Sequence, residues 1–449
     1  MSIMGAVRRH YERVIVACAF LLLFVNVGFT STAFSVYQPY LVEIPGVGNV
    51  GGSFVVTIRT CVAFVCMFFT GAVFKRLNPR IGFFAATACT VLSFFVFSSV
   101  QTMAGLCVAS VLAGVGYGFG GMVASTYLIG NWFKGKVGSV SGVVTMGSGV
   151  AAVVVPVLAG WVIEASSLSA AFMIEGMVAL AIALVVLYFV RMTPYEMGLE
   201  PIGAAPEGDA SAEGEGRGPR ASATGRRPKN PKAPERSRHP KHPKVRLSTV
   251  PLPKGAYVAM MFAIVLLGGV SVAGYNYFGI LLTSNGIDPV IAAAVISVAG
   301  VFLTLSKFAV GKVCDRFGTF AGSAVFFFLL LSAMVLCSLI GHGGVSEAAF
   351  AAVILGIGMP LGTTGVSLWS LELSSPDQML KTIRHFQLAY AFGGFVFNMM
   401  PGVLAQATGN YNSTYDVLSV MTVACAVIVL WVYAHHILRA RREYDRSHI

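Results

Sequence analysis

A lysine, Lys307, lies within the apolar segment 288–311, where a charged side chain is out of place unless it binds something. It precedes Asp315 by eight residues, which at about 1.5 Å per helical residue is roughly 12 Å of helix. A lysine at the centre of a bilayer costs about 2.5–3.5 kcal/mol on insertion scales, so it is expected to face a polar cavity. Lys307 is therefore predicted to contact an anionic ligand. The alternative is a structural lysine that snorkels inward or pairs with Glu372.

A second cation, Arg59, lies about nine residues into another apolar segment, 50–74. This spacing corresponds to roughly 13 Å of helix, again well inside a membrane span. Arg59 is predicted to complete an anion-attracting field in the outer part of the transport pathway. Two alternatives remain open, namely a hydrogen-bonding residue of an outer gate or a shifted segment boundary.

Neutral polar side chains in other apolar segments could complete a binding site. The candidates are Tyr37, Gln38, Tyr117, Tyr127, Tyr275, Asn276, Tyr277 and Tyr390. The alternative for each is a hydrogen bond that packs one helix against another. His385 is a further candidate, either as a proton-sensitive gate, since a free histidine has a pKa of about 6.5, or as an interface residue.

Carboxylates inside the apolar segments are few. Glu175 lies in the segment 168–191 and Glu372 at the end of the segment 347–371, whereas the segments that hold Tyr37, Tyr117, Tyr277 and Lys307 have none at mid-depth. Proton coupling usually needs such a carboxylate. The pattern therefore favours anion exchange or facilitated movement over proton symport.

The elements that must position these residues are membrane-spanning helices. Of the 449 residues, 56% are hydrophobic and 11% charged, whereas soluble domains carry about 25% charged residues. Segments of roughly 20 apolar residues, the length that crosses a bilayer, recur along the chain. Twelve are predicted, at 14–38, 50–74, 81–100, 103–129, 139–163, 168–191, 255–283, 288–311, 319–341, 347–371, 384–407 and 415–437. The fold class is accordingly an all-α membrane protein.

Basic residues alternate along the short connections. Lys and Arg cluster before the first segment, after every second one and after the last, while the intervening connections, such as 39–49 and 408–414, have none. Because positive loops stay in the cytoplasm, both termini are predicted to be cytoplasmic. The predicted location is the cell membrane, crossed many times.

An internal repeat divides the chain. Lys136, Gly149 and Pro156 recur 245 residues later as Lys381, Gly394 and Pro401. Equal topology in both copies predicts two parallel six-helix bundles that enclose a shared cavity. The first bundle comprises residues 1–191, and the second comprises residues 255–449 and ends in a short basic tail.

Residues 192–254 between the bundles are rich in Pro, Gly, Ala, Ser and charge, which predicts a disordered cytoplasmic linker. The linker could contact anionic lipid headgroups. Nucleic acid is not an expected partner, because no aromatic platform or folded module accompanies the charge.

A motif after the eighth segment carries a family resemblance. Gly311-Lys-Val-Cys-Asp315-Arg316-Phe-Gly318, with the two six-helix halves, resembles the major facilitator superfamily. The resemblance implies that Asp315 and Arg316, and Gly71 and Arg76 in the first-half copy, belong to a gate at the cytoplasmic helix ends. Lys75 stands where the family has an acid, so an ion pair there is in doubt.

Further segments resemble one branch of that superfamily. Asn131-Trp132-Phe133, Met192-Thr-Pro194-Tyr-Glu196-Met-Gly198 and Gly402-Val-Leu-Ala-Gln-Ala-Thr-Gly409 are similar to the oxalate/formate antiporter and monocarboxylate transporter group. This implies a transporter of small organic anions, either monocarboxylates or dicarboxylates, working by alternating access. The alternatives are a proton-driven exporter of drugs or metabolites on the same fold, and a non-transporting membrane sensor.

No arrangement of residues typical of an enzyme is present in the sequence, so catalysis is not expected. Neither a cofactor nor a metal is expected. The partners expected are the anion and the lipid bilayer, and the chain is expected to be a monomer.

Overall fold

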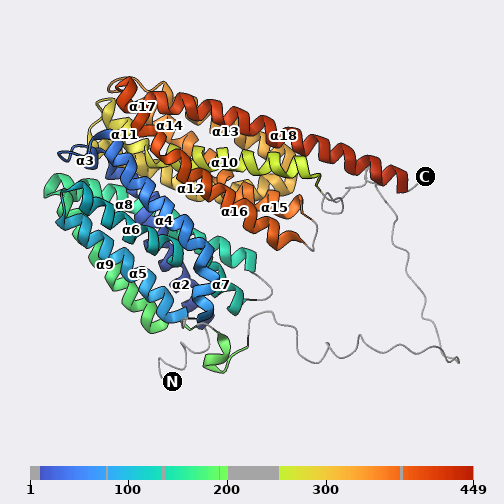
Figure 1. Cartoon of the computed structure of the whole chain (residues 1–449), viewed down its shortest axis with the longest axis horizontal. Helices are drawn as coiled ribbons and strands as arrows, with labels where there is room; N and C mark the ends of the chain where they lie inside the picture. The colour runs from blue at the N-terminus through green and yellow to red at the C-terminus, as the bar shows by residue number, and fades with distance from the viewer. Residues whose placement is uncertain are drawn as a thin grey trace, which may run out of the picture.

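The computed structural model describes residues 11–76, 79–133, 137–191, 193–200, 252–374 and 378–447. Within these residues twelve helices are long and apolar enough to cross a membrane, which confirms the predicted fold class. They lie side by side in one elongated bundle (Figure 1). Large apolar side chains such as Phe328, Leu339 and Val420 are 69–70% exposed on its outside, as a lipid-facing surface requires.

The first six spans follow one another with short connections. They are the span Tyr11–Val36, which begins with α2 (Tyr11–Leu23); α4 (Gly48–Arg76); α5 (Pro79–Ser99); α6 with α7 (Met103–Gly120 and Met122–Trp132); α8 (Val137–Ala165); and α9 (Leu168–Phe189). The short helix α3 (Gln38–Val42) joins the first two spans.

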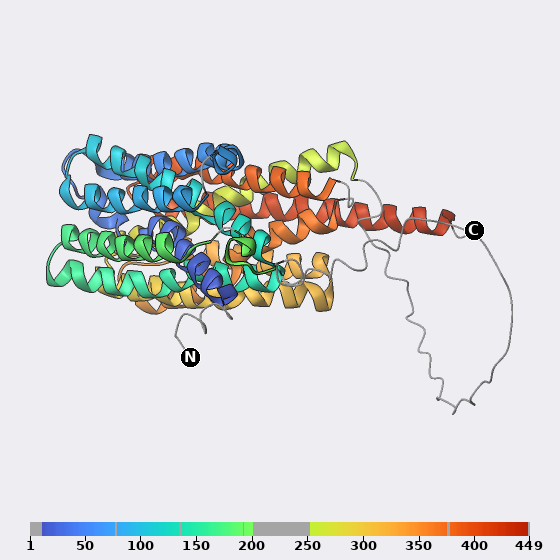
Figure 2. The ribbon, with the colours of Figure 1, turned by 90° about the horizontal axis from the view of Figure 1, so that it is seen from below.

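The second six spans repeat this order. They are α10 with α11 (Lys254–Asn276 and Phe278–Ser284), α12 (Pro289–Phe317), α13 (Thr319–Ser338), α14 with α15 (Val345–Gly358 and Thr364–Glu372), α16 with α17 (Met379–Val396 and Met400–Thr408), and α18 (Asn412–Ser447). Residues 438–447, expected as a basic tail, continue α18 as a helix that extends beyond its neighbours (Figures 1 and 2).

The first, fourth, seventh and tenth spans are interrupted, and so is the eleventh. The first changes from α-helix to a π-helical stretch (Phe24–Thr32) and then a 3₁₀ turn (Phe34–Val36). The fourth breaks at Gly121, the seventh at Tyr277 and the tenth at a 3₁₀ turn, Met359–Gly362. The first and fourth spans of each half are therefore irregular, and such breaks are common at functional sites.

Glycines let the two halves approach closely where α8 packs on α12. A Cβ atom added at Gly149 would lie 2.3 Å from the Thr304 hydroxyl, and one at Gly300 would lie 2.5 Å from the Ala152 carbonyl oxygen. Both distances are far below van der Waals contact, so only glycine permits this helix spacing.

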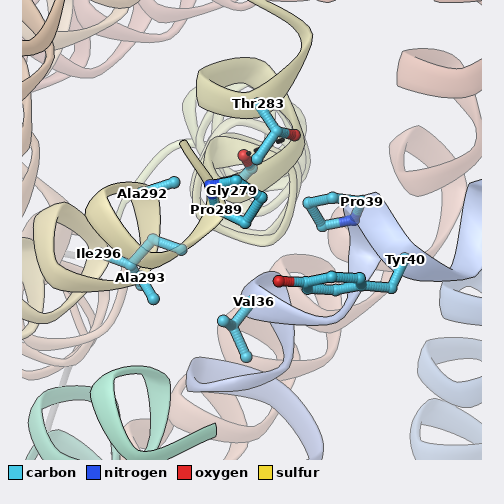
Figure 3. Close-up of a pocket in the computed structure, with 9 residues that line it drawn as sticks. All are labelled: Val36, Pro39, Tyr40, Gly279, Thr283, Pro289, Ala292, Ala293 and Ile296. Atoms are coloured by element: carbon cyan, nitrogen blue, oxygen red, sulfur yellow. Dashed lines mark hydrogen bonds between the residues drawn. The ribbon is translucent and has the colours of Figure 1, made fainter. Parts of the chain in front are cut away.

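The halves meet at one end of the bundle and diverge toward the other. The diverging end holds the described ends of the chain, Tyr11 and Ser447, and is here called the termini end; the opposite one is the far end (Figure 1). At the far end Val36, Pro39 and Tyr40 face Gly279 and Pro289 across a crevice too small for a water molecule (Figure 3). The halves are thus closed against each other at the far end. By the predicted orientation, the termini end is cytoplasmic.

Part of the predicted linker is folded. Residues Pro194–Met197 form a 3₁₀ turn that is capped by Thr193 and Glu196, and Met197 and Leu199 pack against the first half. Most of the predicted basic linker, residues 201–251, lies outside the described residues.

Candidate functional site

Arg59 occupies the middle of α4. It follows the first residue of the helix, Gly48, by eleven positions, about 16 Å of helix rise. Its side chain is only 3% exposed, and its guanidinium carbon lies 4.9 Å from the centre of the Phe34 ring. A guanidinium over an aromatic face is an attractive cation–π contact. The irregular part of the first span therefore supplies one wall around this cation.

The Arg59 guanidinium is short of polar partners. Neither of its terminal nitrogens, Nη1 and Nη2, has a hydrogen-bond partner within the part of the chain that the structure describes. Arginine remains charged in proteins, and an uncompensated buried charge costs several kcal/mol. A charge placed at this cost inside a span is expected to meet an opposite charge, and here that charge would come from a ligand.

Two tyrosines stand beside Arg59. Tyr117 on α6 and Tyr277 at the break between α10 and α11 both lie within electrostatic range of the guanidinium. The Tyr277 hydroxyl donates to the Asn398 carbonyl at 2.7 Å, and the Asn398 amide donates to the Thr60 hydroxyl at 3.5 Å. Arg59 thus lies at the contact between the two halves.

Lys307 lies on α12, ten residues before the last residue of the helix, Phe317, or about 15 Å from the termini end. Its Nζ donates to the Thr145 carbonyl of α8 at 3.5 Å, across the contact between the halves. The side chain is partly exposed. Lys307 does not pair with Glu372, whose carboxylate instead accepts a hydrogen bond from Tyr433 at 3.2 Å. Lys307 therefore lies between the two halves, nearer the termini end of α12 than its start.

Three of the predicted neutral residues, Tyr275, Asn276 and Tyr390, lie on α10 and α16, which pack against each other. Tyr275 and Asn276 are 7% and 3% exposed, and the Tyr275 hydroxyl and Asn276 Nδ2 find no partner in the described residues. Tyr390 is close to Tyr117 and to Ser271. Tyr390 is thus linked to Arg59 through Tyr117.

Three others are placed elsewhere. Tyr37 is fully buried in the first half and donates a hydrogen bond to Glu175. Gln38 Nε2 donates to the Gly52 carbonyl at 3.5 Å, near the far end. Tyr127 on α7 is 44% exposed and lies nearer the termini end. None of the three is brought beside Arg59.

The predicted gate residues lie near the termini end, and His385 is among them because its partner Tyr257 lies three residues after the start of α10. Arg76 is exposed at the end of α4, and Arg316 is exposed with its guanidinium 5.6 Å from the Phe317 ring centre. Gly71 lies in α4 and Asp315 in α12, but their surroundings are outside what the structure describes. His385 Nδ1 is hydrogen-bonded to the Tyr257 hydroxyl at 2.8 Å, which fits the interface interpretation.

Two groups beside Arg59 were not expected from the sequence. Phe34 is one phenylalanine of 32 and carries no signal that would separate it from the others. Asn398 could have been found, because it is an amide within the apolar segment 384–407. As for metals, the described residues contain no cluster of three or more His, Cys, Asp or Glu that could hold an ion.

Comparisons with known proteins agree on the fold. A family model described as the Major Facilitator Superfamily matches residues 19–379. The structure of the nucleoside transporter NupG is similar, with a TM-score of 0.65 and 14% identity over 94% of this chain and 99% of that one. A D-xylose-proton symporter has a TM-score of 0.66 and 12% identity, covering 94% and 97%. A POT family transporter in complex with 5-aminolevulinic acid has a TM-score of 0.66 and 10% identity, and the match covers 94% of this chain and 96% of that one.

These identities are low enough that the likeness establishes the fold and nothing finer. A search of curated proteins found no match.

Proposed function

This chain belongs to the Major Facilitator Superfamily and is a transporter of that type, and we propose that its cargo is a small organic anion. Transport rather than catalysis is its role. The similar structures are named for a nucleoside, for D-xylose with a proton, and for a complex with 5-aminolevulinic acid, so they do not single out one class of cargo.

The observation that carries the proposal is the Arg59 guanidinium, which is 3% exposed and has two nitrogens without hydrogen-bond partners among the described residues. A carboxylate fits this group because two parallel N–H···O bonds match its geometry. At 4 Å and an effective dielectric constant of 20, such a pair interacts by about 4 kcal/mol. A bound carboxylate would therefore offset much of the cost of burying Arg59.

Lys307 adds a second positive charge on the path from the termini end. The Lys307 side chain is partly exposed, and among the described residues its ammonium group donates to the Thr145 carbonyl, so the group is able to attract an anion. Lysine is a compact charge without a planar fork, which suits attraction more than fixed recognition. We assign Lys307 to anion entry and Arg59 to anion recognition.

Movement of the halves would follow from binding. A carboxylate on Arg59 makes the pair neutral, and a neutral pair is less costly to carry past apolar surroundings than a lone charge. The two bundles would then separate at the far end and close at the termini end. The interrupted spans beside Arg59, the first and the seventh, provide the places where the backbone can adjust.

Uptake by purified protein in proteoliposomes tests the proposal. Labelled formate, lactate, oxalate and succinate are compared with labelled nucleosides, sugars and a lipophilic cation. We expect saturable uptake of at least one carboxylate and none of the others. The matched pair of variants is Arg59→Gln and Arg13→Gln, since Arg13 is exposed and far from Arg59.

Carboxylate uptake that is lost in Arg59→Gln and kept in Arg13→Gln supports the proposal. Carboxylate uptake that is absent from the wild type, together with efflux of the lipophilic cation driven by a pH gradient, would replace it with the exporter on the same fold.

A further inference from the structure

A buried carboxyl group on α9, Glu175, is not used by the site described above. It lies seven residues after Leu168, about 10 Å of helix from the far end, and is 7% exposed. Its Oε1 accepts a hydrogen bond from the Tyr37 hydroxyl, while Oε2 has no partner in the described part of the chain. An ionisable group at this depth in a span usually has a function.

Within the part of the chain that the structure describes, no cation interacts with Glu175. The elements packed against α9 include α5, α2, α8 and the π-helical stretch Phe24–Thr32. Of the titratable side chains that these elements and the end of the first span contribute in the described residues, Tyr37 is the one that interacts with Glu175. The side of α5 at this level presents rings, Phe94 and Phe95, to Gly176. Nothing here neutralises a carboxylate, so a proton is the natural counter-charge.

A chain of contacts joins Glu175 to Arg59. The Tyr37 ring centre is 5.7 Å from that of Phe34, and the Phe34 ring lies 4.9 Å from the Arg59 guanidinium carbon. Tyr37 and Phe34 are three residues apart around a 3₁₀ turn, where side chains at this spacing lie on one face. A change at Glu175 therefore has a short path to Arg59, through the irregular part of the first span.

A small cavity lies between this pair and the far end. It has a volume of about 60 Å³, and its lining includes Ser98, Gln101, Ser169 and Phe172. One water needs about 10–15 Å³ on this measure, so a few waters fit. Gln101 is exposed at the far surface, while the Phe172 ring centre is 4.3 Å from that of Tyr37. One aromatic ring thus separates a water-sized space from the Tyr37–Glu175 pair.

From these contacts we propose that Glu175 binds the proton that is carried with the anion, and that Tyr37 and Phe34 link its protonation to Arg59. The proposal rests on the proposed function, and it replaces the anion exchange or facilitated movement that the scarcity of carboxylates in the sequence favours. The proton comes from water in the far-end cavity, and binding converts the carboxylate to a neutral acid. With a monocarboxylate on Arg59, one proton and one anion move together and no net charge crosses the membrane. The acid later releases the proton on the other side.

The experiment distinguishes transport of the anion from coupling of that transport to a proton. Proteoliposomes are used for two measurements, which are exchange of labelled against unlabelled anion at equal pH, and accumulation of the anion driven by acidic outer medium. Glu175→Gln is expected to keep exchange within about twofold of the wild type and to lose accumulation. Tyr37→Phe is expected to weaken accumulation by several fold. Glu164→Gln, an exposed carboxyl near the end of α8, serves as the matched control and is expected to keep both.

A pH-sensitive dye inside wild-type vesicles provides a measurement that needs no variant. Adding the anion outside is expected to acidify the interior as the anion enters, and a proton ionophore with a potassium clamp abolishes any pH difference as a control. Exchange without acidification, or full accumulation by Glu175→Gln, would overturn the proton site and leave the anion carrier intact. No uptake or exchange of any carboxylate would instead overturn the proposed function itself.

Discussion

The two halves place their single mid-span cations on corresponding helices but at different depths. Arg59 belongs to the second span of the first half and Lys307 to the second span of the second half. At the 240-residue offset that relates Gly71 to Gly311, Arg59 corresponds to Ala299 and Lys307 to Met67. The two positions differ by eight residues, about 12 Å along the helix.

Their environments differ as much as their depths. Arg59 is buried against Phe34 with two unpartnered nitrogens, whereas Lys307 is partly exposed and reaches a backbone carbonyl. The repeat therefore preserves the helices but not the charges. Under the proposed function, the two halves therefore have different roles, with anion recognition in the first half and anion attraction in the second.

The largest effect is expected from Arg59→Gln. Losing a charge-assisted hydrogen bond of about 2 kcal/mol corresponds to roughly a 30-fold fall in uptake efficiency, because about 1.4 kcal/mol is one factor of ten. Arg59→Lys is expected to recover only part of it, since lysine lacks the planar fork. Initial uptake rates over a range of anion concentrations provide the measurement. Equal activity of Arg59→Lys and wild type would show that recognition does not depend on guanidinium geometry.

A second prediction concerns the close contact between the halves. Gly300→Ala is expected to lower stability by about 1–3 kcal/mol, because the new methyl group would meet the Ala152 backbone at 2.5 Å. Gly311→Ala on the same helix is the control, since its Cβ would meet nothing within 4 Å. Thermal unfolding of both variants in detergent measures the difference. Similar melting temperatures for the two would mean that α8 and α12 pack less closely than described.

Lys307→Gln is expected to have a smaller effect than Arg59→Gln. Removal of a partly exposed charge should raise the KM several fold and change the maximal rate little, because the charge attracts the anion and does not fix it. The effect should shrink at high salt, since screening weakens attraction between exposed charges. Lys254→Ala, an exposed lysine at the start of α10, is the matched control. A loss equal to that of Arg59→Gln and independent of salt would place Lys307 in the recognition site.

The smallest effect is expected from Thr60→Val. Its hydroxyl accepts a long hydrogen bond, 3.5 Å, from the Asn398 amide across the halves. Loss of such a bond is worth about 0.5–1 kcal/mol at most, and it weakens the closed far end. The rate of labelling of a cysteine placed at Asn49 reports opening there, and should rise about twofold. A fall in labelling would show that Thr60 does not help to hold the far end closed.

The sequence by itself was enough to predict the twelve spans, since each needs about 20 apolar residues in series and the structure confirms twelve such helices. It also predicted that Arg59 and Lys307 lie inside spans, because a charged residue within an apolar segment can be identified from the sequence alone. The family motif was equally visible, and the match over residues 19–379 confirms the superfamily. The branch and the cargo remain predictions.

Only the tertiary structure decided which charge is buried and what surrounds it. The sequence drew attention to Lys307, yet among the described residues it is Arg59 whose guanidinium nitrogens are buried without partners, because exposure depends on where the halves touch and where they diverge. Tyr37 was expected beside a ligand, but it bonds Glu175 across 138 residues of sequence. In a helix that is apolar on all sides, the sequence pattern does not indicate which face contacts which neighbour. These contacts could therefore be identified only from the tertiary structure.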